Sequence, residues 1–517
     1  MSQNQDMSNP GGEQPLEDRV NNRSMRPNSS AFKDFMAASW APVEDSGETR
    51  LASADYALER RSKLSARFPG ERLVLPAGPL KVRSNDTDYR FRAHSGFAHM
   101  TGLGVDHEAD AVLVMEPVEA GAGENGSGHV STLYFRPMAG RDSSEFYSNS
   151  RSGEFWIGPR PTLESLSLMT GLPTAHMDLS LEDALTRNAG LVALGGLTVR
   201  LVRDVDQTVD AMIDTSRYNT GVDLEASDAS DGALSEALSE LRLVKDAWEI
   251  EQMRAAVAAT ANGFDDVVRS IPRAMNHKRG ERVIEGAFFS RAREEGNDLG
   301  YDTIAASGNH ATILHWIRND GQVNAGELVL VDAGVEADSL YTADITRTVP
   351  VDGTFTEVQA RIYQAVLDAA DAAFDIVKPG ITFRTIHETA LAVLADRLHG
   401  WGLLPVSVEE AISPAGQQHR RWMPHGTSHH LGLDVHDCAQ ARQELYQDGI
   451  VEAGMVFTIE PGLYFKAEDL AVPAEYRGIG VRIEDDILVT ADGAERLSAD
   501  VPRTIAQVEA WMASTGA

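Results

Sequence analysis

Residues 328–353 read LVLVDAGVEADSLYTADITRTVPVDG, and this stretch decides how we interpret the fold. Its two apolar runs, 328–331 and 345–351, are β-like, and each lies beside an aspartate, Asp332 or Asp344. A hairpin between the runs would bring the two carboxylates face to face. Because burial of an isolated carboxylate is strongly unfavourable unless a cation compensates it, this pattern favours a bound cation.

Three more candidate ligands lie at or near the ends of other β-like runs. Glu460 ends the run MVFTIE, Glu484 lies in GVRIEDD, and His429 lies in HGTSHHLGLDVH. One such carboxylate alone is ordinarily a turn or surface residue, whereas four together would need about two divalent cations to balance their charge. Oxygen-rich ligation with one imidazole suits hard ions, Mn²⁺ before Co²⁺, Fe²⁺ or Zn²⁺. A pair of such ions activates water for hydrolysis.

The length of 517 residues exceeds what one hydrophobic core ordinarily holds, so we expect two domains. Residues 1–50 are rich in Ser, Asn, Asp, Pro and Gly and are expected to be a mobile tail. Residues 51–225 mix β-like runs at 111–115, 131–135 and 190–194 with a helical stretch at 53–64, which indicates a smaller α/β domain. The acidic, Ser-rich residues 226–240 are expected to be a linker to a second domain, 241–517.

The second domain combines helices with short strands. Helical spacing predicts helices at 241–264, 356–377 and 383–399. Further β-like runs lie at 328–331, 345–351, 432–435, 455–459 and 480–489. Helices beside mostly antiparallel strands favour an α+β fold.

Composition and charge exclude several classes of protein. Hydrophobic residues make up 42% and charged residues 24%, which is a globular composition. The formal net charge is −32 without a basic patch, so we expect neither a nucleic-acid nor a membrane partner. No apolar run reaches the about 18 residues of a membrane span, and the N-terminus has no signal-peptide core. Cys438 is the only cysteine, which favours a reducing compartment, and we expect a cytoplasmic protein.

Five sequence blocks resemble, in order and spacing, the motif blocks of the pita-bread metallopeptidases: LHWIRND (314–320), VLVDAGVEADSLYTADITRTVPVDG (329–353), MPHGTSHHLGLDVHD (423–437), FTIEPGLY (457–464) and GIGVRIEDDILVT (478–490). The resemblance is closest to the aminopeptidase P (Xaa-Pro aminopeptidase) group and covers residues 241–500. The segments 83–103 and 153–161 resemble that group's amino-terminal domain. The resemblance implies a C-terminal pita-bread catalytic domain of α+β class, preceded by a smaller α/β creatinase-like domain.

The resemblance also implies a role for each site residue. Five residues would be the ligands of two divalent ions, most simply Mn²⁺: Asp332, Asp344, His429, Glu460 and Glu484. Of these, Asp344 and Glu484 would bridge both ions, and Glu460 would shuttle protons for a metal-bridging hydroxide. Three other histidines would bind substrate and stabilise the oxyanion: His315, His425 and His436. Tyr464 and Arg482 would shape the site and orient Glu484 or its neighbours.

Other reactive side chains receive a structural interpretation. His430 lies next to His429, but the motif assigns the metal to the position four after His425. His387 lies in a helical stretch, so we expect no catalytic role for it. Cys438 has no evident basic helper and is expected to be a packed thiol.

The implied activity is removal of the N-terminal residue from peptides whose second residue is proline. Prolidase, which cuts Xaa-Pro dipeptides, is the nearest alternative. Methionine aminopeptidase is disfavoured by the full N-terminal domain, and the metal-free creatine hydrolase by the presence of all five ligands. A non-enzymatic pita-bread binding protein is the alternative from another class, but such proteins usually lack ligands. The resemblance further implies a homodimer or homotetramer.

Overall fold

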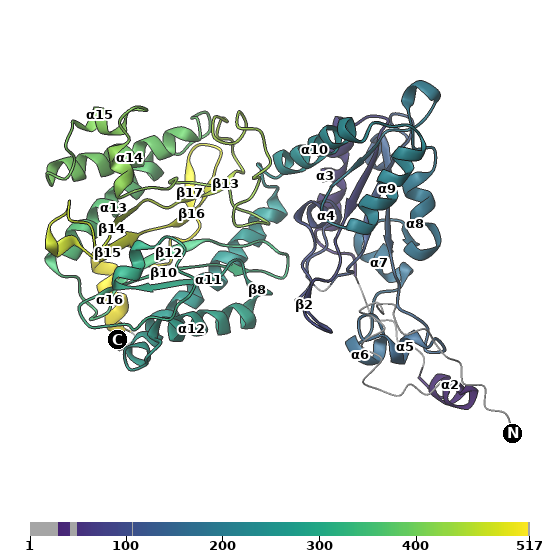
Figure 1. Ribbon diagram of the computed structural model, residues 1–517, viewed down its shortest axis with the longest axis horizontal. Coiled ribbons are helices and arrows are strands. Elements are labelled where there is room, and N and C mark those ends of the chain that lie inside the picture. The colour runs from purple at the N-terminus through teal and green to yellow at the C-terminus, as the bar shows by residue number, and fades with distance from the viewer. Residues whose placement is uncertain (1–28, 42–48, 106, 515–517) are drawn as a thin grey trace, which may run out of the picture. The chain divides into compact units, whose positions relative to one another are not determined.

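The computed structural model describes residues 29–41, 49–105 and 107–514, and the chain divides into two compact units, Met1–Gly232 and Ala233–Ala517 (Figure 1). Most of the expected mobile tail, 1–50, lies outside the described residues; the part inside them holds helix α2 (Ser30–Ala37). Among the described residues, no helix combines the length and the apolar character needed to cross a membrane.

The residues expected to be a linker, 226–240, are helical. Helix α10 (Leu224–Leu241) runs through these residues and across the boundary between the units. The reason is an apolar face: Leu234, Ala237 and Leu238 recur at helical spacing and are buried. The acidic and serine residues that suggested a linker lie between these apolar positions.

The first unit is built on a five-stranded sheet with the order β6-β5-β4-β1-β7. Its strands are β1 (Arg72–Pro76), β4 (Val112–Pro117), β5 (His129–Phe135), β6 (Thr174–His176) and β7 (Val199–Leu201), and a small hairpin joins β2 (Val82–Ser84) to β3 (Thr87–Asp88). Its helices are α3 (Ala54–Arg67), α4 (Ser95–Thr101), α5 (Glu145–Ser148), α6 (Glu154–Ile157), α7 (Leu163–Thr170), α8 (Met177–Thr186) and α9 (Gln207–Asn219). The sheet mixes parallel and antiparallel pairs and carries helices, so the expected α/β class is confirmed.

One run of the first unit was interpreted wrongly. Residues 190–194 form no strand; they hold a 3₁₀ turn, Val192–Leu194. Gly190 and Gly195 flank this turn with φ of 155° and 84°, backbone conformations that side chains rarely allow and that interrupt an extended strand. The edge strand is β7, further along the chain.

The second unit contains the three helices that hydrophobic periodicity predicts, with shifted ends: α11 (Ala247–Met275), α13 (Glu357–Asp375) and α14 (Arg384–Gly400). It also contains three that were not predicted: α12 (Gly280–Glu295), α15 (Val408–Ile412) and α16 (Ile505–Ser514). Helix α11 begins later than expected because Asp246 and Glu249 form a capping box at its start. In Figure 1, α11 lies beside α12 and α13 beside α14.

The strands of the second unit form small antiparallel sheets. One sheet has the order β12-β10-β9, with β9 (Ile304–Ser307), β10 (Leu328–Ala333) and β12 (Ile345–Pro350). Another has the order β13-β16-β17, with β13 (Val456–Ile459), β16 (Asp485–Val489) and β17 (Ala494–Arg496). Two-stranded ladders pair β14 (Gly462–Phe465) with β15 (Ile479–Arg482), and β8 (Asp298–Leu299) with β11 (Val335–Glu336). Together with the helices they confirm the α+β class.

Two expected runs differ from the structure in a way that matters for the site. The run 480–489 is two strands, because the chain leaves β14 after Arg482 and joins β13 at Asp485. The segment opposite it makes the corresponding change: β13, which pairs with β16, ends at Ile459, and β14, which pairs with β15, begins at Gly462. Glu484 lies in the short break between β15 and β16, and Glu460 lies in the break between β13 and β14. The run 432–435 is a turn-rich loop and no strand.

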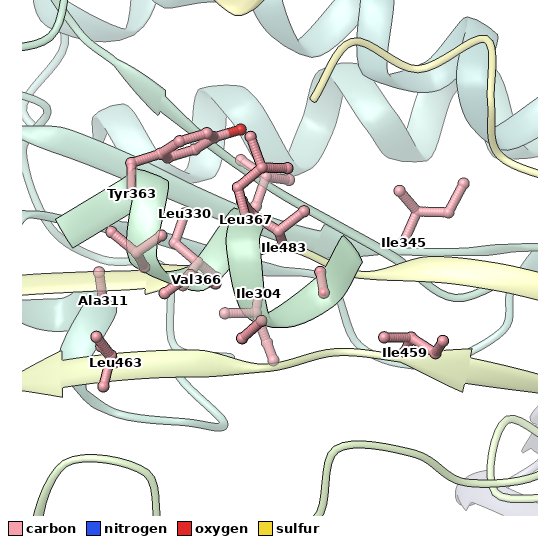
Figure 2. Close-up of a cluster of buried hydrophobic side chains, with 14 of the residues drawn as sticks. Ile304, Ala311, Leu330, Ile345, Tyr363, Val366, Leu367, Ile459, Leu463 and Ile483 are labelled. Atoms are coloured by element: carbon pink, nitrogen blue, oxygen red, sulfur yellow. The ribbon is translucent and has the colours of Figure 1, made fainter. Parts of the chain in front are cut away.

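A continuous hydrophobic core lies directly behind these strand ends. Helix α13 contributes Tyr363, Val366 and Leu367, which are buried against side chains of the strands (Figure 2). Ile345, Ile459 and Ile483 belong to the same core and are at most 2% exposed, although each is adjacent in sequence to a candidate metal ligand. The core therefore sets the positions from which the acidic side chains project.

Candidate metal centre

Strands β10 and β12 bring the two aspartates of the hairpin together. Their register pairs Asp332 with Thr346 and Ala333 with Ile345, so Asp344 lies one residue beyond the last pair. The Tyr301 hydroxyl contacts both carboxylates, with 2.6 Å between its oxygen and Asp332 Oδ1. Because one hydroxyl carries one proton, it can donate to only one carboxylate at a time. The two carboxylates are therefore close enough to share a single ligand.

Glu460, Glu484 and His429 complete the group. Glu484 accepts a hydrogen bond from Thr346 Oγ1 at 2.6 Å. His429 Nε2 lies 3.3 Å from Asp344 Oδ2 and 3.7 Å from Glu460 Oε1. Ligand atoms of Asp344, His429 and Glu484 all lie within 4.8 Å of one another. The structure thus gathers the five expected ligands from four separate strand ends and a loop.

The acidic group lines a cavity of about 350 Å³. Apolar side chains form part of its wall, and three histidines from two loops face the same space. The lining residues are Tyr301, Asp302, Ile304, Leu314, His315, Ile317, Asp332, Asp344, His425, His429, Val435, His436, Glu460, Arg482 and Glu484. The cavity is large enough for part of a peptide beside the acidic group.

Arg482 is the guanidinium of this site. Its Nη2 donates to Asp332 Oδ2, its Nε donates to Thr346 Oγ1 at 3.0 Å, and its Nη1 donates to Tyr464 Oη at 3.1 Å. Thr346 in turn donates to Glu484. That Arg482 orients Glu484 or its neighbours stays a prediction. The hydrogen bonds are consistent with it, because Arg482 donates directly to Asp332 and also to Thr346, which donates to Glu484.

The electrostatics of the cluster show an excess of negative charge. Burial raises the pKa of Asp332, Glu484 and Glu460, that of Glu460 to about 7, and neighbouring carboxylates contribute further. Burial lowers the pKa of His429, but Asp344 and Glu460 outweigh it and raise the value to about 9. All of these shifts express the same shortage of positive charge around the buried carboxylates.

The donor set fits divalent metal ions. Three buried carboxylates and the half-buried Glu460 face one guanidinium and leave negative charge that two divalent cations would compensate. The ligand atoms of Asp344, His429 and Glu484 lie at mutual distances that allow shared coordination. One imidazole among oxygen donors suits hard ions. The residues present therefore match what a dinuclear centre needs.

The three histidines outside the ligand group differ in their hydrogen bonds. His425 Nδ1 donates to Gly426 O at 2.6 Å, so its Nε2 accepts from Tyr464 Oη at 2.8 Å. Burial lowers the pKa of His425 to about 3, so this ring is neutral. His436 packs edge-on against His429 with 4.6 Å between ring centres, and burial lowers its pKa as well. Among the described residues, the rings of His315 and His436 have no hydrogen-bond partner.

A buried ion network fixes the loop that carries His436. Asp437, the next residue, is 1% exposed; it accepts a hydrogen bond from Arg242 Nε at 2.8 Å and from Lys245 Nζ at 3.2 Å. Burial raises the pKa of Asp437, but Arg242 and Lys245 outweigh this and lower the value to about 2. The loop is therefore tied to the segment that leads into α11.

The side chains with a structural interpretation lie outside the ligand group. His430 is fully buried and stacks on Phe383 with 4.6 Å between ring centres. His387 Nδ1 accepts from Thr427 N at 3.1 Å and so supports the loop before His429. Cys438 is buried, and burial raises the pKa of its thiol.

Sequence reasoning missed two residues that touch the ligands. Tyr301 lies in a short loop before β9. Thr346 lies in β12, two residues after Asp344. The only available signal for Thr346 was this period of two next to a candidate ligand. Nothing in the sequence around Tyr301 indicated that it reaches Asp332, 31 residues away.

Known proteins are similar to both units. The model for metallopeptidase family M24 matches residues 251–491, and the model for the N-terminal domain of aminopeptidase P matches residues 57–191. The chain is 48% identical over 485 residues to Xaa-Pro aminopeptidase 2 of Streptomyces coelicolor, covering 94% of this chain and 96% of that protein. It is 29% identical over 470 residues to Xaa-Pro aminopeptidase 3 of Homo sapiens, covering 89% and 86% of the two chains.

Solved structures are similar over nearly the same length. Aminopeptidase PepP of Pseudomonas aeruginosa matches with a TM-score of 0.74 and 30% identity, covering 90% of this chain and 99% of that one. Aminopeptidase P from E. coli with the inhibitor Pro-Leu matches with a TM-score of 0.73 and 28% identity, at the same coverage. The two-unit architecture is thus shared with these proteins.

We expect Tyr301→Phe to weaken metal binding by about 10–100-fold, because the lost hydroxyl orients two ligands. Isothermal titration with Mn²⁺ of chelator-treated protein measures the change. The matched control is Tyr363→Phe, which removes a buried hydroxyl that donates to Arg503 O at 2.7 Å, away from the carboxylates. Equal affinities of Tyr301→Phe and the control would show that Tyr301 does not support the ligands.

We expect Asp437→Asn to reduce stability in a pH-dependent way. The folded pKa of about 2 lies below the ordinary 3.8, so the carboxylate stabilises the fold above about pH 4 and loses this contribution as the pH falls through about 2. The pH-dependent difference in unfolding free energy from wild type should be on the order of 2 kcal/mol. Urea unfolding from pH 7 to 2 measures it, with the exposed Asp492→Asn as control. A difference that grows on acidification would contradict the assignment.

Proposed function

The chain belongs to metallopeptidase family M24, and from this premise we propose that it is an Xaa-Pro aminopeptidase, which removes the N-terminal residue from peptides with proline in second place. One observation carries the proposal: the acidic group and His429 share a cavity with three further histidines. The relatives named above, similar over almost the whole chain, support the same substrate class.

Two divalent ions are proposed for the acidic group, with Mn²⁺ favoured by the oxygen-rich donor set. Their ligands would be Asp332, Asp344, His429, Glu460 and Glu484, with Asp344 and Glu484 shared by both ions. When bound, the ions supply Lewis-acid chemistry for amide hydrolysis. Zinc can replace the metal of a similar protein, since a zinc-substituted E. coli aminopeptidase P is known in complex with product.

The chain's own residues supply the proton transfers and the hydrogen-bond donors. Glu460 faces both His429 Nε2 and His425 Nδ1 at 3.7 Å, and we assign it the proton that passes to the leaving nitrogen. His436 lines the cavity without a hydrogen-bond partner among the described residues, so its ring N–H is available to the substrate carbonyl oxygen. His425 is already engaged by Tyr464 and serves as a fixed wall.

Proline explains why such a site must recognise shape. An Xaa-Pro bond has a tertiary amide without an N–H, and the ring fixes φ. A site for this bond cannot use the missing donor, so it must enclose the ring. His315, His425 and Tyr464 are the walls that we propose. The free amine of the first residue would meet a carboxylate or a metal ion, which limits removal to one residue.

The compartment and the assembly are also part of the proposal. A reducing compartment, the cytoplasm, is consistent with a chain whose only cysteine is buried and inert. A homodimer or homotetramer is supported by exposed apolar side chains on α6: Phe155, Trp156 and Ile157 are 50–61% exposed. Adjacent exposed apolar groups of this size are typical of interfaces.

The decisive experiment is an assay of purified protein with Xaa-Pro-Yaa peptides, before and after chelation and restoration with Mn²⁺, Co²⁺ or Zn²⁺. We expect cleavage after the first residue, little cleavage when alanine replaces proline, and none of N-acetylated peptide. Chelation should abolish the activity, because the ions supply the Lewis acid.

Three outcomes would contradict this proposal. Equal hydrolysis of the alanine peptide or of the acetylated peptide would indicate a broader hydrolase. Cleavage restricted to Xaa-Pro dipeptides would indicate a prolidase. Undiminished activity in chelator, with no tightly bound divalent ion, would exclude the metal mechanism.

We expect His436→Ala to lower kcat by about 10²–10³-fold, the size expected for one lost donor to the transition state, while the metal content stays the same. Steady-state kinetics and metal analysis measure both quantities. His429→Ala is the comparison, because it should lose metal. Metal loss in His436→Ala equal to that in His429→Ala would show that the two roles are exchanged.

A further inference from the structure

His315 lies on a loop, and contacts of the His315 ring do not explain how that loop is held in place. The loop runs from Gly308 to Gly321 between β9 and β10, and Leu314, His315 and Ile317 line the cavity. Among the described residues, the His315 ring has no hydrogen bond and no ion pair, and the residue is exposed. Its position must therefore come from contacts of the neighbouring loop residues.

Those contacts converge on one carboxylate, Glu281, in the first turn of α12. Glu281 is 0% exposed. Its Oε1 accepts hydrogen bonds from Ser307 N at 2.9 Å and from His310 Nδ1 at 2.7 Å. Its Oε2 accepts from Trp316 Nε1 at 2.8 Å and from Gly321 N at 2.6 Å. One side chain thus holds the beginning, the middle and the end of the loop.

The ring contacts around Glu281 reinforce this arrangement. His310 stacks on Trp316 with 3.8 Å between ring centres and 25° between the planes. Trp316 directs its indole N–H to Glu281, while its neighbours His315 and Ile317 face the cavity. Gly321 leaves the space that the carboxylate uses, because a Cβ there would meet Glu281 Oε2 at 2.7 Å. Trp316 and His315 are therefore positioned as one unit.

We propose that Glu281 is a positioning residue of the active site, which holds the loop 308–321 by four hydrogen bonds and so fixes His315 against the substrate. The proposal rests on the proposed function, in which His315 contacts the proline-containing substrate. Glu281 itself does not line the cavity, so it acts only through the loop.

The chemistry of the four hydrogen bonds makes a sharp test possible. Three of the partners are N–H groups that can only donate, and His310 Nδ1 donates to the carboxylate in the tautomer that carries its proton there. In Glu281→Gln, the amide nitrogen directs N–H groups at two of these donors in either orientation. At least one hydrogen bond is lost with almost no change in volume, because only His310 can change its tautomer and accept from the amide.

The test is a double-mutant cycle on cleavage of an Xaa-Pro-Yaa peptide, with wild type, Glu281→Gln, His315→Ala and the double variant. We expect Glu281→Gln to lower kcat/KM by about 10–10²-fold, as misplacement of a contact by about 1 Å does, with unchanged metal content. In the His315→Ala background, Glu281→Gln should change kcat/KM less than about twofold, because the two residues act as one unit. If Glu281 affected stability alone, the losses in kcat/KM of Glu281→Gln and His315→Ala would multiply in the double variant.

A second variant and a control keep the test decisive. Trp316→Phe removes one donor and keeps a stacking ring, and we expect about a fivefold loss that also vanishes in the His315→Ala background. Trp316→Phe replaces Glu281→Gln in the double-mutant cycle if Glu281→Gln does not fold. The control is Glu249→Gln, a buried carboxylate that accepts from Tyr341 Oη at 2.7 Å away from the loop; its kcat/KM should equal that of wild type.

Each outcome has one meaning. Losses of Glu281→Gln and His315→Ala that multiply in the double variant overturn the proposal, and so does a Glu281→Gln enzyme with wild-type kinetics. Metal loss in Glu281→Gln also overturns it, because the four hydrogen bonds of Glu281 go to Ser307, His310, Trp316 and Gly321, and none of these is a proposed ligand. Failure of wild type to cleave any Xaa-Pro-Yaa peptide is a separate result, which would refute the proposed function itself.

Discussion

The second unit depends on holding four carboxylates next to one another against their mutual repulsion. Each is adjacent in sequence to a core residue that is at most 2% exposed: Val331, Ile345, Ile459 and Ile483. Burying the apolar neighbour helps to fix the position from which each acidic side chain projects into the cavity. Full burial of one such apolar side chain contributes about 1.5–3 kcal/mol. Hydrophobic packing, with help from Arg482, therefore holds the acidic group in place, and bound cations would complete it.

The networks that hold the ligands and the substrate-facing histidines meet at Tyr464, which accepts a hydrogen bond from Arg482 and donates one to His425. Tyr301, Thr346 and Arg482 donate to the carboxylates. The histidines are held by other groups: His425 by Tyr464, the loop of His436 by Asp437 with its two buried cations, and the loop of His315 by Glu281. The Glu281 and Asp437 networks contain none of the five proposed ligands, whereas His425 is linked to Asp332 through Tyr464 and Arg482.

The sequence predicted the parts of the site that are local and missed the parts that depend on long-range contacts. The hairpin of Asp332 and Asp344 was predictable, because a period of two and flanking carboxylates are visible in one stretch. The break between Arg482 and Asp485 was not, because a β-like run does not reveal that the chain changes its partner strand. Tyr301 and Glu281 were missed for the same reason: each reaches its partners across separate elements. Helix α10 was hidden by its acidic surface.

Two neighbouring aspartates on β16 show that three arginines pair with Asp485 and not with the carboxylates of the acidic centre. Asp485 faces Arg347, Arg496 and Arg503; burial raises its pKa, but these guanidinium groups outweigh burial and lower it. Asp486 points the other way and accepts from Asp344 N at 3.1 Å; burial and then Asp344 raise its pKa well above the ordinary value. The period of two along a strand thus separates Asp485, which pairs with arginines, from Asp486, which faces Asp344. Among the described residues, Arg482 is thus the one arginine in an ion pair with the four carboxylates, and divalent ions would supply the remaining positive charge.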